Sequence, residues 1–122
     1  MAVLTRAFAL RRPVDEVHAF VAALRGPRSA DVSQFYRHYG ISHESWHVQE
    51  TKHGPWVIVV TVVDDVTASE RYRAASDEFH DWFKAQVLHL SGIDPNVDPR
   101  GPETNSIFSW SDTERPHSHV FA

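Results

Sequence analysis

The sequence contains no cysteine and a single methionine. The absence of cysteine excludes a disulfide framework, a thiolate nucleophile and any zinc site built on cysteine ligands. The 122 residues, 42% hydrophobic and 23% charged, are enough for one domain with its own core. Such a chain can fold without a disulfide or a structural metal. We therefore expect residues 1–112 to form one domain and residues 113–122 to form a loose tail.

Long apolar runs and clusters of basic residues are also missing. No stretch approaches the ~20 apolar residues of a membrane span. Arg6 interrupts the short apolar run at the start, which argues against a secretory signal. The 12 Lys and Arg residues form no cluster longer than Arg11-Arg12, and the formal net charge is −4. We expect a cytoplasmic protein that binds neither nucleic acid nor a membrane.

Motifs that mark common cofactors and nucleophiles are absent as well. The sequence has no glycine-rich phosphate loop, no serine nucleophile elbow and no haem-attachment motif. It has 9 histidines, and His43 and His47 have the i, i+4 spacing of a helical zinc site. The residues from Ser45 onward alternate as in a strand, however, and a strand would point the two rings differently. We therefore expect no metal site and no cofactor.

Hydrophobic periodicity predicts a strand and two helices in the first third of the chain. Residues 2–10 alternate as in a strand. Pro13 then precedes a helix with one apolar stripe, which ends at Gly26-Pro27. A shorter helix is expected from Ser29 to Tyr39.

A hairpin and a further helical region are predicted next. Residues 45–51 and 56–63 have the pattern of two strands joined by a turn at 52–55. Thr67 and Glu70 have the spacing of a capping box, in which the threonine caps the start of a long helix. That helix ends at Gly92 and has a candidate break at Ser76-Asp77, with an aromatic stripe of core residues in its second half.

The end of the chain completes a familiar order of elements. Residues 94–105 contain three prolines and are expected to be a loop, and residues 107–110 have the pattern of a short final strand. The order strand, helix, strand, strand, helix, strand predicts an α+β fold of the ferredoxin-like βαββαβ kind. Its sheet would have four antiparallel strands, with the helices on one face.

This order of elements, together with three sequence segments, resembles the dimeric α+β-barrel group and in particular its small uncharacterised bacterial members. The segments are 39–46, beginning Tyr-Gly-Ile, then Val-Gln-Glu-Thr at 48–51, and 77–83, beginning Asp-Glu-Phe. The group includes small antibiotic-biosynthesis-type monooxygenases, haem-degrading monooxygenases and muconolactone isomerases. The resemblance implies a dimeric α+β barrel that binds or transforms a small apolar or aromatic molecule without metal or nucleotide. It carries over no catalytic residue.

The strand predicted at 56–63 indicates a homodimer independently of that resemblance. Its side chains are apolar on both faces, as in strands that are buried on both sides. Two helices can cover only one face of a four-stranded sheet. The other face would expose an apolar patch on the order of several hundred Å², near the limit for a monomer. A second copy of the chain is the simplest cover.

The expected hairpin register assigns side chains to the two faces. A turn centred on His53-Gly54 would pair Thr51 with Trp56, Gln49 with Ile58 and His47 with Val60. The face away from the helices would then carry four of the more polar or aromatic side chains, namely His47, Gln49, Thr51 and Trp56. The more aliphatic set, with Trp46, Val48 and Glu50 among it, would face the helices.

We expect a ligand cavity between the first of these faces and the covering copy, since ligand sites are mostly apolar with a few convergent polar groups. Its expected ligand-binding residues are His47, Gln49, Trp56 and, in the roof, Tyr36. His47 is the best candidate for a catalytic general base, because imidazole titrates near neutral pH.

Two functions remain open from the sequence, and it does not decide whether the protein is an enzyme. In the first, the dimer binds or transforms a small apolar molecule. In the alternative, it is a non-catalytic interaction or regulatory module whose interior is filled, with Trp56 and Trp110 as the plugging side chains.

Overall fold

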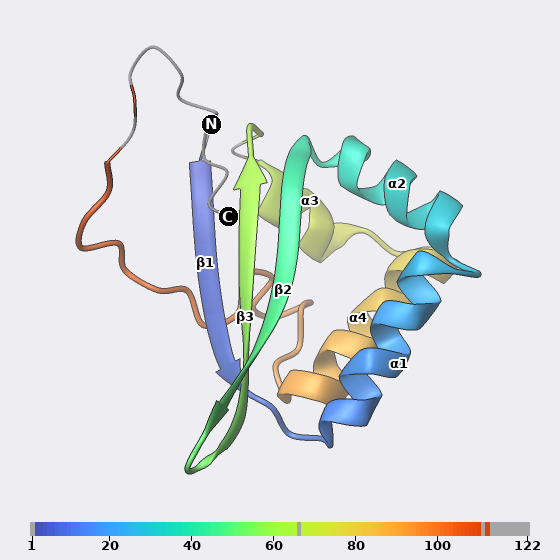
Figure 1. The fold of residues 1–122 in the computed structure, drawn as a ribbon. Helices are drawn as coiled ribbons and strands as arrows, with labels where there is room; N and C mark the ends of the chain where they lie inside the picture. Colours follow the sequence, from blue (N-terminus) through green and yellow to red (C-terminus); the bar gives the residue numbers. More distant parts are fainter. Residues whose placement is uncertain (1, 66, 111, 113–122) are drawn as a thin grey trace.

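The computed structural model describes residues 2–65, 67–110 and 112, so the tail expected at 113–122 lies outside the described residues. Within the described part, the chain is an α+β protein with one three-stranded antiparallel sheet and four helices (Figure 1). The elements are, in chain order, β1 (Ala2–Ala9), α1 (Val14–Arg25), α2 (Ser29–His38), β2 (Ile41–Thr51), β3 (Gly54–Val63), α3 (Ala68–Ala74) and α4 (Glu78–Ser91).

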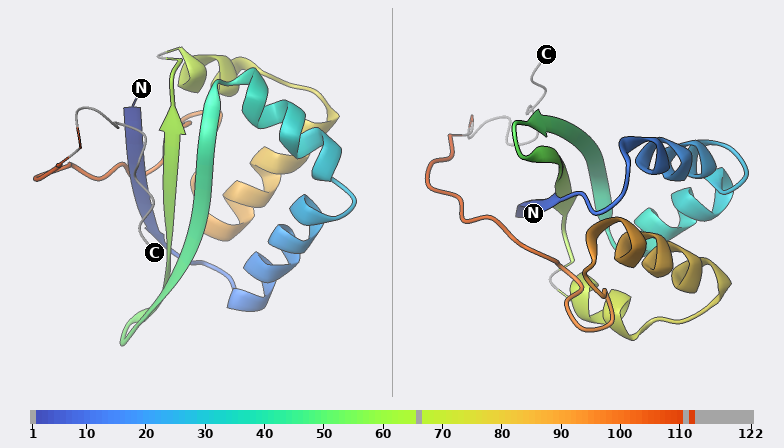
Figure 2. Two further views of the ribbon diagram at one scale, coloured as in Figure 1. Left: turned by 45° about the horizontal axis from the view of Figure 1, so that its top comes forward. Right: turned by 90° about the horizontal axis from the view of Figure 1, so that it is seen from below.

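The helices lie on one side of the sheet, as the two views of Figure 2 show. The strand order is β1-β3-β2, so the apolar strand β3 occupies the centre and pairs with both neighbours. The core fills the space between the sheet and the helical layer. Its buried members come from β1, α1, α2, β3 and α4, and they are Phe8, Val17, Phe20, Phe35, Tyr39, Val57, Val59, Phe83 and Leu90. No helix or strand of the described residues covers the opposite face, which we call the open face, although Val62 near its upper end is only 4% exposed.

The predicted break at Ser76-Asp77 is confirmed, and it separates α3 from α4. α3 ends at Ala74, and Asp77 starts α4 because its Oδ1 accepts a hydrogen bond of 2.8 Å from the His80 amide. Gly92 ends α4 in the left-handed conformation, with φ of 76°. A side chain there would be strained, and its Cβ would lie 3.2 Å from the Arg11 guanidinium carbon.

The capping box predicted at Thr67 and Glu70 is wrong. Thr67 already has near-helical angles, with φ of −94° and ψ of 0°, whereas a capping threonine needs extended backbone to turn its hydroxyl over the helix. Asp65 supplies the local hydrogen bonds instead. Its Oδ1 accepts from the Thr67 amide at 2.8 Å and from the Thr67 hydroxyl at 2.7 Å.

The hairpin register differs from the predicted one by two residues. Thr51 pairs with Gly54, Gln49 with Trp56 and His47 with Ile58, because the turn contains only Lys52 and His53. Side chains alternate with a period of two along a strand, so a shift of two keeps every residue on its predicted face. The second strand also begins earlier than expected, at Ile41.

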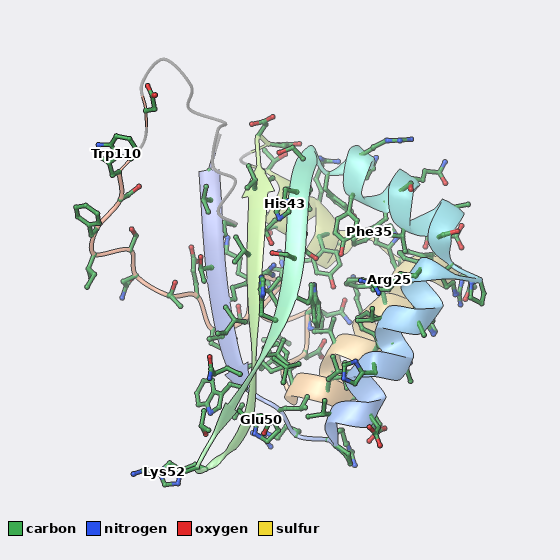
Figure 3. All side chains as sticks on the ribbon, in the orientation of Figure 1. Arg25, Phe35, His43, Glu50, Lys52 and Trp110 are labelled. Atoms are coloured by element: carbon green, nitrogen blue, oxygen red, sulfur yellow. The ribbon has the colours of Figure 1, made fainter. Side chains whose placement is uncertain are left out.

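The strand predicted at residues 107–110 is not formed, so the expected four-stranded ferredoxin-like sheet is not observed. The chain reaches the outer edge of β1 only briefly: the Ala7 amide donates to Pro102 O at 3.2 Å and the Thr104 amide to Thr5 O at 2.8 Å. Beyond Thr104 it leaves the edge, and Figure 3 shows Trp110 far from the sheet and the helices. An apolar alternating run forms a strand only where a neighbouring strand accepts its hydrogen bonds.

Candidate functional site

A cavity of about 120 Å³ lies between the helix-facing side of the sheet and the helices. A cavity of roughly 150 Å³ in an apolar core can hold benzene, so this one has the size of a single aromatic ring. Figure 3 shows Phe35 on the inner side of α2, where it forms part of the wall. The aromatic side chains that line the cavity are Phe8, Phe35, Tyr36, Tyr39, Trp46, Tyr72 and Phe83.

Three polar side chains enter this apolar region from the sheet. Glu44 of β2 pairs with Thr61 of β3, and Arg6 of β1 pairs with Val59, one step along the same face. Strand alternation therefore points Arg6, Glu44 and Thr61 toward the helices. All three line the cavity.

The Glu44 carboxylate is the centre of a hydrogen-bond network at the cavity wall. Its Oε2 accepts from the Tyr36 hydroxyl at 2.5 Å and from Trp46 Nε1 at 3.1 Å. Its Oε1 accepts from the Thr61 hydroxyl at 2.7 Å and from Arg6 Nη2 at 3.4 Å. Arg6 Nη2 also donates to the Thr61 hydroxyl at 2.7 Å, so Thr61 links the cation to the anion.

This ion pair is held away from water. The Glu44 side chain is 8% exposed and the Arg6 side chain 23%. Among the described residues, Arg6 Nε is a buried nitrogen without a hydrogen-bond partner. Burying two charges costs several kcal/mol per ion, and apolar residues of similar volume are often as stabilising or more so. Packing alone therefore does not account for the pair.

Two tyrosines near Glu44 are held in the protonated form. Burial raises the pKa of Tyr36 far above its usual value of 10.0, and the charge of Glu44 raises it further. Burial and then Glu44 raise the pKa of Tyr72 in the same way. Tyr36 donates its proton to Glu44, whereas the Tyr72 hydroxyl makes no hydrogen bond with any described residue. Tyr72 thus gives the cavity a hydroxyl that can donate to or accept from a ligand.

A second chain of hydrogen bonds positions Tyr39, another wall residue. The Tyr39 hydroxyl lies 2.7 Å from His80 Nε2, and His80 Nδ1 lies 2.9 Å from Asp77 Oδ1. Because Asp77 accepts hydrogen bonds as the cap of α4, its pKa is lowered, chiefly by the His80 amide. The assigned order of donors is then Tyr39 to His80 to Asp77, which fixes the Tyr39 ring against α4.

The loop after α4 forms the remaining wall of the cavity, through residues between Ile93 and Pro102. It is attached at three places. Arg100 Nε donates to the Ser69 hydroxyl of α3 at 3.1 Å, Lys84 Nζ donates to Asn96 Oδ1 at 2.9 Å, and Pro102 O accepts from the Ala7 amide. These attachments hold the loop across the cavity from the sheet.

The structure separates the predicted site residues. Tyr36 lines the cavity, but His47, Gln49 and Trp56 point to the open face on the other side of the sheet. There His47 Nε2 lies 2.9 Å from the Ser45 hydroxyl, and Gln49 Nε2 donates to Glu50 O at 3.2 Å. Trp56 is 39% exposed. The four side chains therefore do not share one site within a single chain.

The sequence analysis missed Glu44, Arg6 and Thr61, although a signal for them was present. The predicted strand began at residue 45, so Glu44 lay outside it. The observed strand begins at Ile41, and Glu44 therefore lies on the same face as Trp46 and Val48. Arg6 likewise shares the face of Leu4 and Phe8. A charged residue at an inward position of an alternating strand is the pattern that identifies Arg6 and Glu44, and Thr61 is the uncharged polar residue that pairs with both strands beside them.

No protein-family model matches the chain, and no curated protein or solved structure matches it either. Among the described residues, no three metal-ligating side chains gather at one place. The helices of this same part are too short or too polar to cross a membrane.

Proposed function

We propose that the protein binds a small, mostly apolar molecule, about the size of one aromatic ring and with one polar group, in the cavity between the sheet and the helices. The observation that carries the proposal is the buried Glu44 network inside an aromatic cavity. A few convergent polar groups in an apolar pocket are the usual features of a ligand site. The protein's own side chains supply these groups, so the proposal requires neither a metal nor a nucleotide.

The polar end of the ligand is placed by Arg6, Glu44 and Tyr72. Arg6 and Glu44 neutralise each other, so a neutral ligand fits better than a charged one. The Tyr72 hydroxyl favours a hydroxyl or carbonyl group on that ligand. If the ligand is also transformed, as the resemblance to the α+β-barrel group implies, Glu44 is the candidate proton acceptor.

The test uses phenol and toluene, two single-ring probes that differ in one hydroxyl, and measures binding by ligand-observed NMR. We expect both to bind and phenol to bind more tightly. Tyr72→Phe should weaken phenol about tenfold, the loss of one hydrogen bond of about 1.4 kcal/mol, and leave toluene unchanged. Equal losses for the two probes would contradict the assigned polar end.

A cavity-filling variant distinguishes this cavity from the rest of the surface. Ala68 lines the cavity at the start of α3, and Ala74 is exposed at the end of the same helix. Ala68→Trp should abolish binding of both probes, whereas Ala74→Trp should leave it intact. If neither probe binds the unmodified protein, the ligand proposal fails and the non-catalytic module is the better description.

We also propose that the protein is a homodimer joined through the open face. The inward residues of β1, β2 and β3 include Arg6 and Glu44, but the open-face residues include no Asp, Glu, Lys or Arg. They are Val3, Thr5, Ala7, Ala9, His43, Ser45, His47, Gln49, Thr51, Trp56, Ile58, Val60 and Val62. A sheet face that meets water normally carries charged side chains, and their absence from the centre of a surface is typical of interfaces. In such a dimer His47, Gln49 and Trp56 would lie at the interface.

A further inference from the structure

Residues 105–110 form an extended segment, here called the arm, whose apolar side chains lie in solvent. Ile107 is 97% exposed, Phe108 82% and Trp110 78%. Three large apolar side chains within four residues are a patch of the kind that marks an interaction site. The arm contains no charged residue.

The arm starts at a fixed point. The Thr104 amide and hydroxyl both donate to Thr5 O, each at 2.8 Å, which anchors the chain on the outer edge of β1. From there it runs beyond β1 on the side away from the helices (Figures 1 and 2). The arm therefore projects on the side of the open face, but its exposed side chains do not pack on that face in its own copy.

The area of the open face indicates what the arm contacts. Three strands of about eight residues, spaced about 4.8 Å apart with a rise of about 3.4 Å, cover roughly 400 Å². A stable interface buries about 800 Å² on each partner. A flat footprint of this size is a small basis for such an interface. Aromatic side chains bury about 150–250 Å² of accessible surface each, so docking of Phe108 and Trp110 together with Ile107 would add several hundred Å².

We propose that the arm of each copy docks against the open face of a second copy, so that the two copies exchange arms. This inference rests on the homodimer proposed above and specifies how its interface is completed. A two-fold axis makes such contacts reciprocal: the arm that leaves the β1 edge of one copy covers apolar side chains of the partner, and the partner's arm does the same. Neither the arm nor the open face carries a charged side chain, so docking of one on the other would bury no unpaired charge.

The first experiment compares dimer dissociation by sedimentation over a dilution series. We expect the unmodified chain to be a dimer at micromolar concentration. Replacing Ile107, Phe108 and Trp110 together by serine should raise the dissociation constant at least 100-fold. Val97→Ser is the matched control, because Val97 is 79% exposed but lies in the loop after α4, and it should change nothing. An unchanged dimer in the triple variant overturns the arm exchange and leaves the homodimer standing, whereas a monomeric unmodified chain overturns both.

The second experiment uses the absence of cysteine from the chain, which makes a single introduced thiol specific. Phe108→Cys should react with a maleimide at least tenfold more slowly at concentrations where the protein is dimeric than after dilution to monomer. Val97→Cys should react quickly at both concentrations. Protection of Phe108→Cys at both concentrations would mean that the arm docks on its own copy, and rapid reaction at both would mean that it does not dock; either result overturns the proposal.

Discussion

Glu44 illustrates how one residue can organise a region of the core. Its carboxylate accepts hydrogen bonds from Tyr36, Trp46, Thr61 and Arg6, which come from all three strands and α2. Hydrogen bonds to an ionised group are worth about 1.5–3 kcal/mol each, more than neutral ones. The network therefore fixes the orientation of α2 on the sheet and, with it, the shape of the cavity.

The three tyrosines of the chain provide a test at the residue scale. Burial raises the pKa of Tyr36, Tyr39 and Tyr72 above the usual value of 10.0. A raised pKa of an acid stabilises the folded state below pH 10, and this contribution is lost as the pH rises above 10. We therefore expect less phenolate absorbance at pH 10 in the folded protein than in the unfolded one, and a urea midpoint that falls at higher pH.

The control for this titration is the protein in concentrated urea, where all three tyrosines should ionise together near pH 10. Tyr36→Phe should lower the free energy of unfolding at pH 7, because Glu44 then loses a donor. Ionisation of all three tyrosines near pH 10 while the protein stays folded would contradict the burial of the Tyr36 and Tyr72 hydroxyls.

At the scale of elements, α3 depends on its surroundings. It has seven residues, fewer than an isolated helix needs in water. Lys84 of α4 holds its end: Nζ donates to Arg73 O at 3.1 Å and to Ala75 O at 2.6 Å, in addition to Asn96 Oδ1. Burial lowers the pKa of Lys84, while the negative charges of Asp81, Asp94 and Asp77 favour its cation.

We predict that Lys84→Met lowers the free energy of unfolding by about 2–3 kcal/mol, because it leaves the carbonyl groups at the end of α3 and Asn96 without their donor. Lys52→Met, in the exposed hairpin turn, should have no measurable effect. Urea unfolding followed by circular dichroism measures both. Equal stability of the two variants would show that the Lys84 contacts contribute little.

For the whole molecule, the open face is the feature with the largest consequence. In the proposed dimer, an aspartate at Ile58, in the middle of β3 on that face, would bury an unpaired charge between two copies, which costs several kcal/mol. We predict that Ile58→Asp is a monomer by light scattering at concentrations where the unmodified chain is a dimer. Val97→Asp, which places the same charge elsewhere, should remain dimeric. A dimer of unchanged affinity in Ile58→Asp would place the interface on another surface.

The sequence predicted much of the fold and less of the site, and the differences have physical causes. The helices at α1 and α2, the hairpin and the break before α4 follow from local patterns, namely periodicity, turn residues and the cap at Asp77. The predicted fourth strand failed because the chain pairs with the edge of β1 only between Pro102 and Thr104 and then leaves it, and a local pattern does not report such a path. Glu44 was missed because β2 begins at Ile41 rather than at the predicted residue 45, and its contacts with Arg6 and Thr61 join residues far apart in the chain.

The sequence by itself determined which side chains share a face of the sheet, since backbone geometry fixes the alternation even when the register moves by two. It also determined that β3 is apolar on both sides. Only the tertiary structure decided that the cavity lies on the helix side, with Glu44 and Arg6 at its wall rather than His47. Alternation distinguishes two faces but does not specify what packs against each one. Which face encloses a cavity depends on how helices distant in sequence fit together over it.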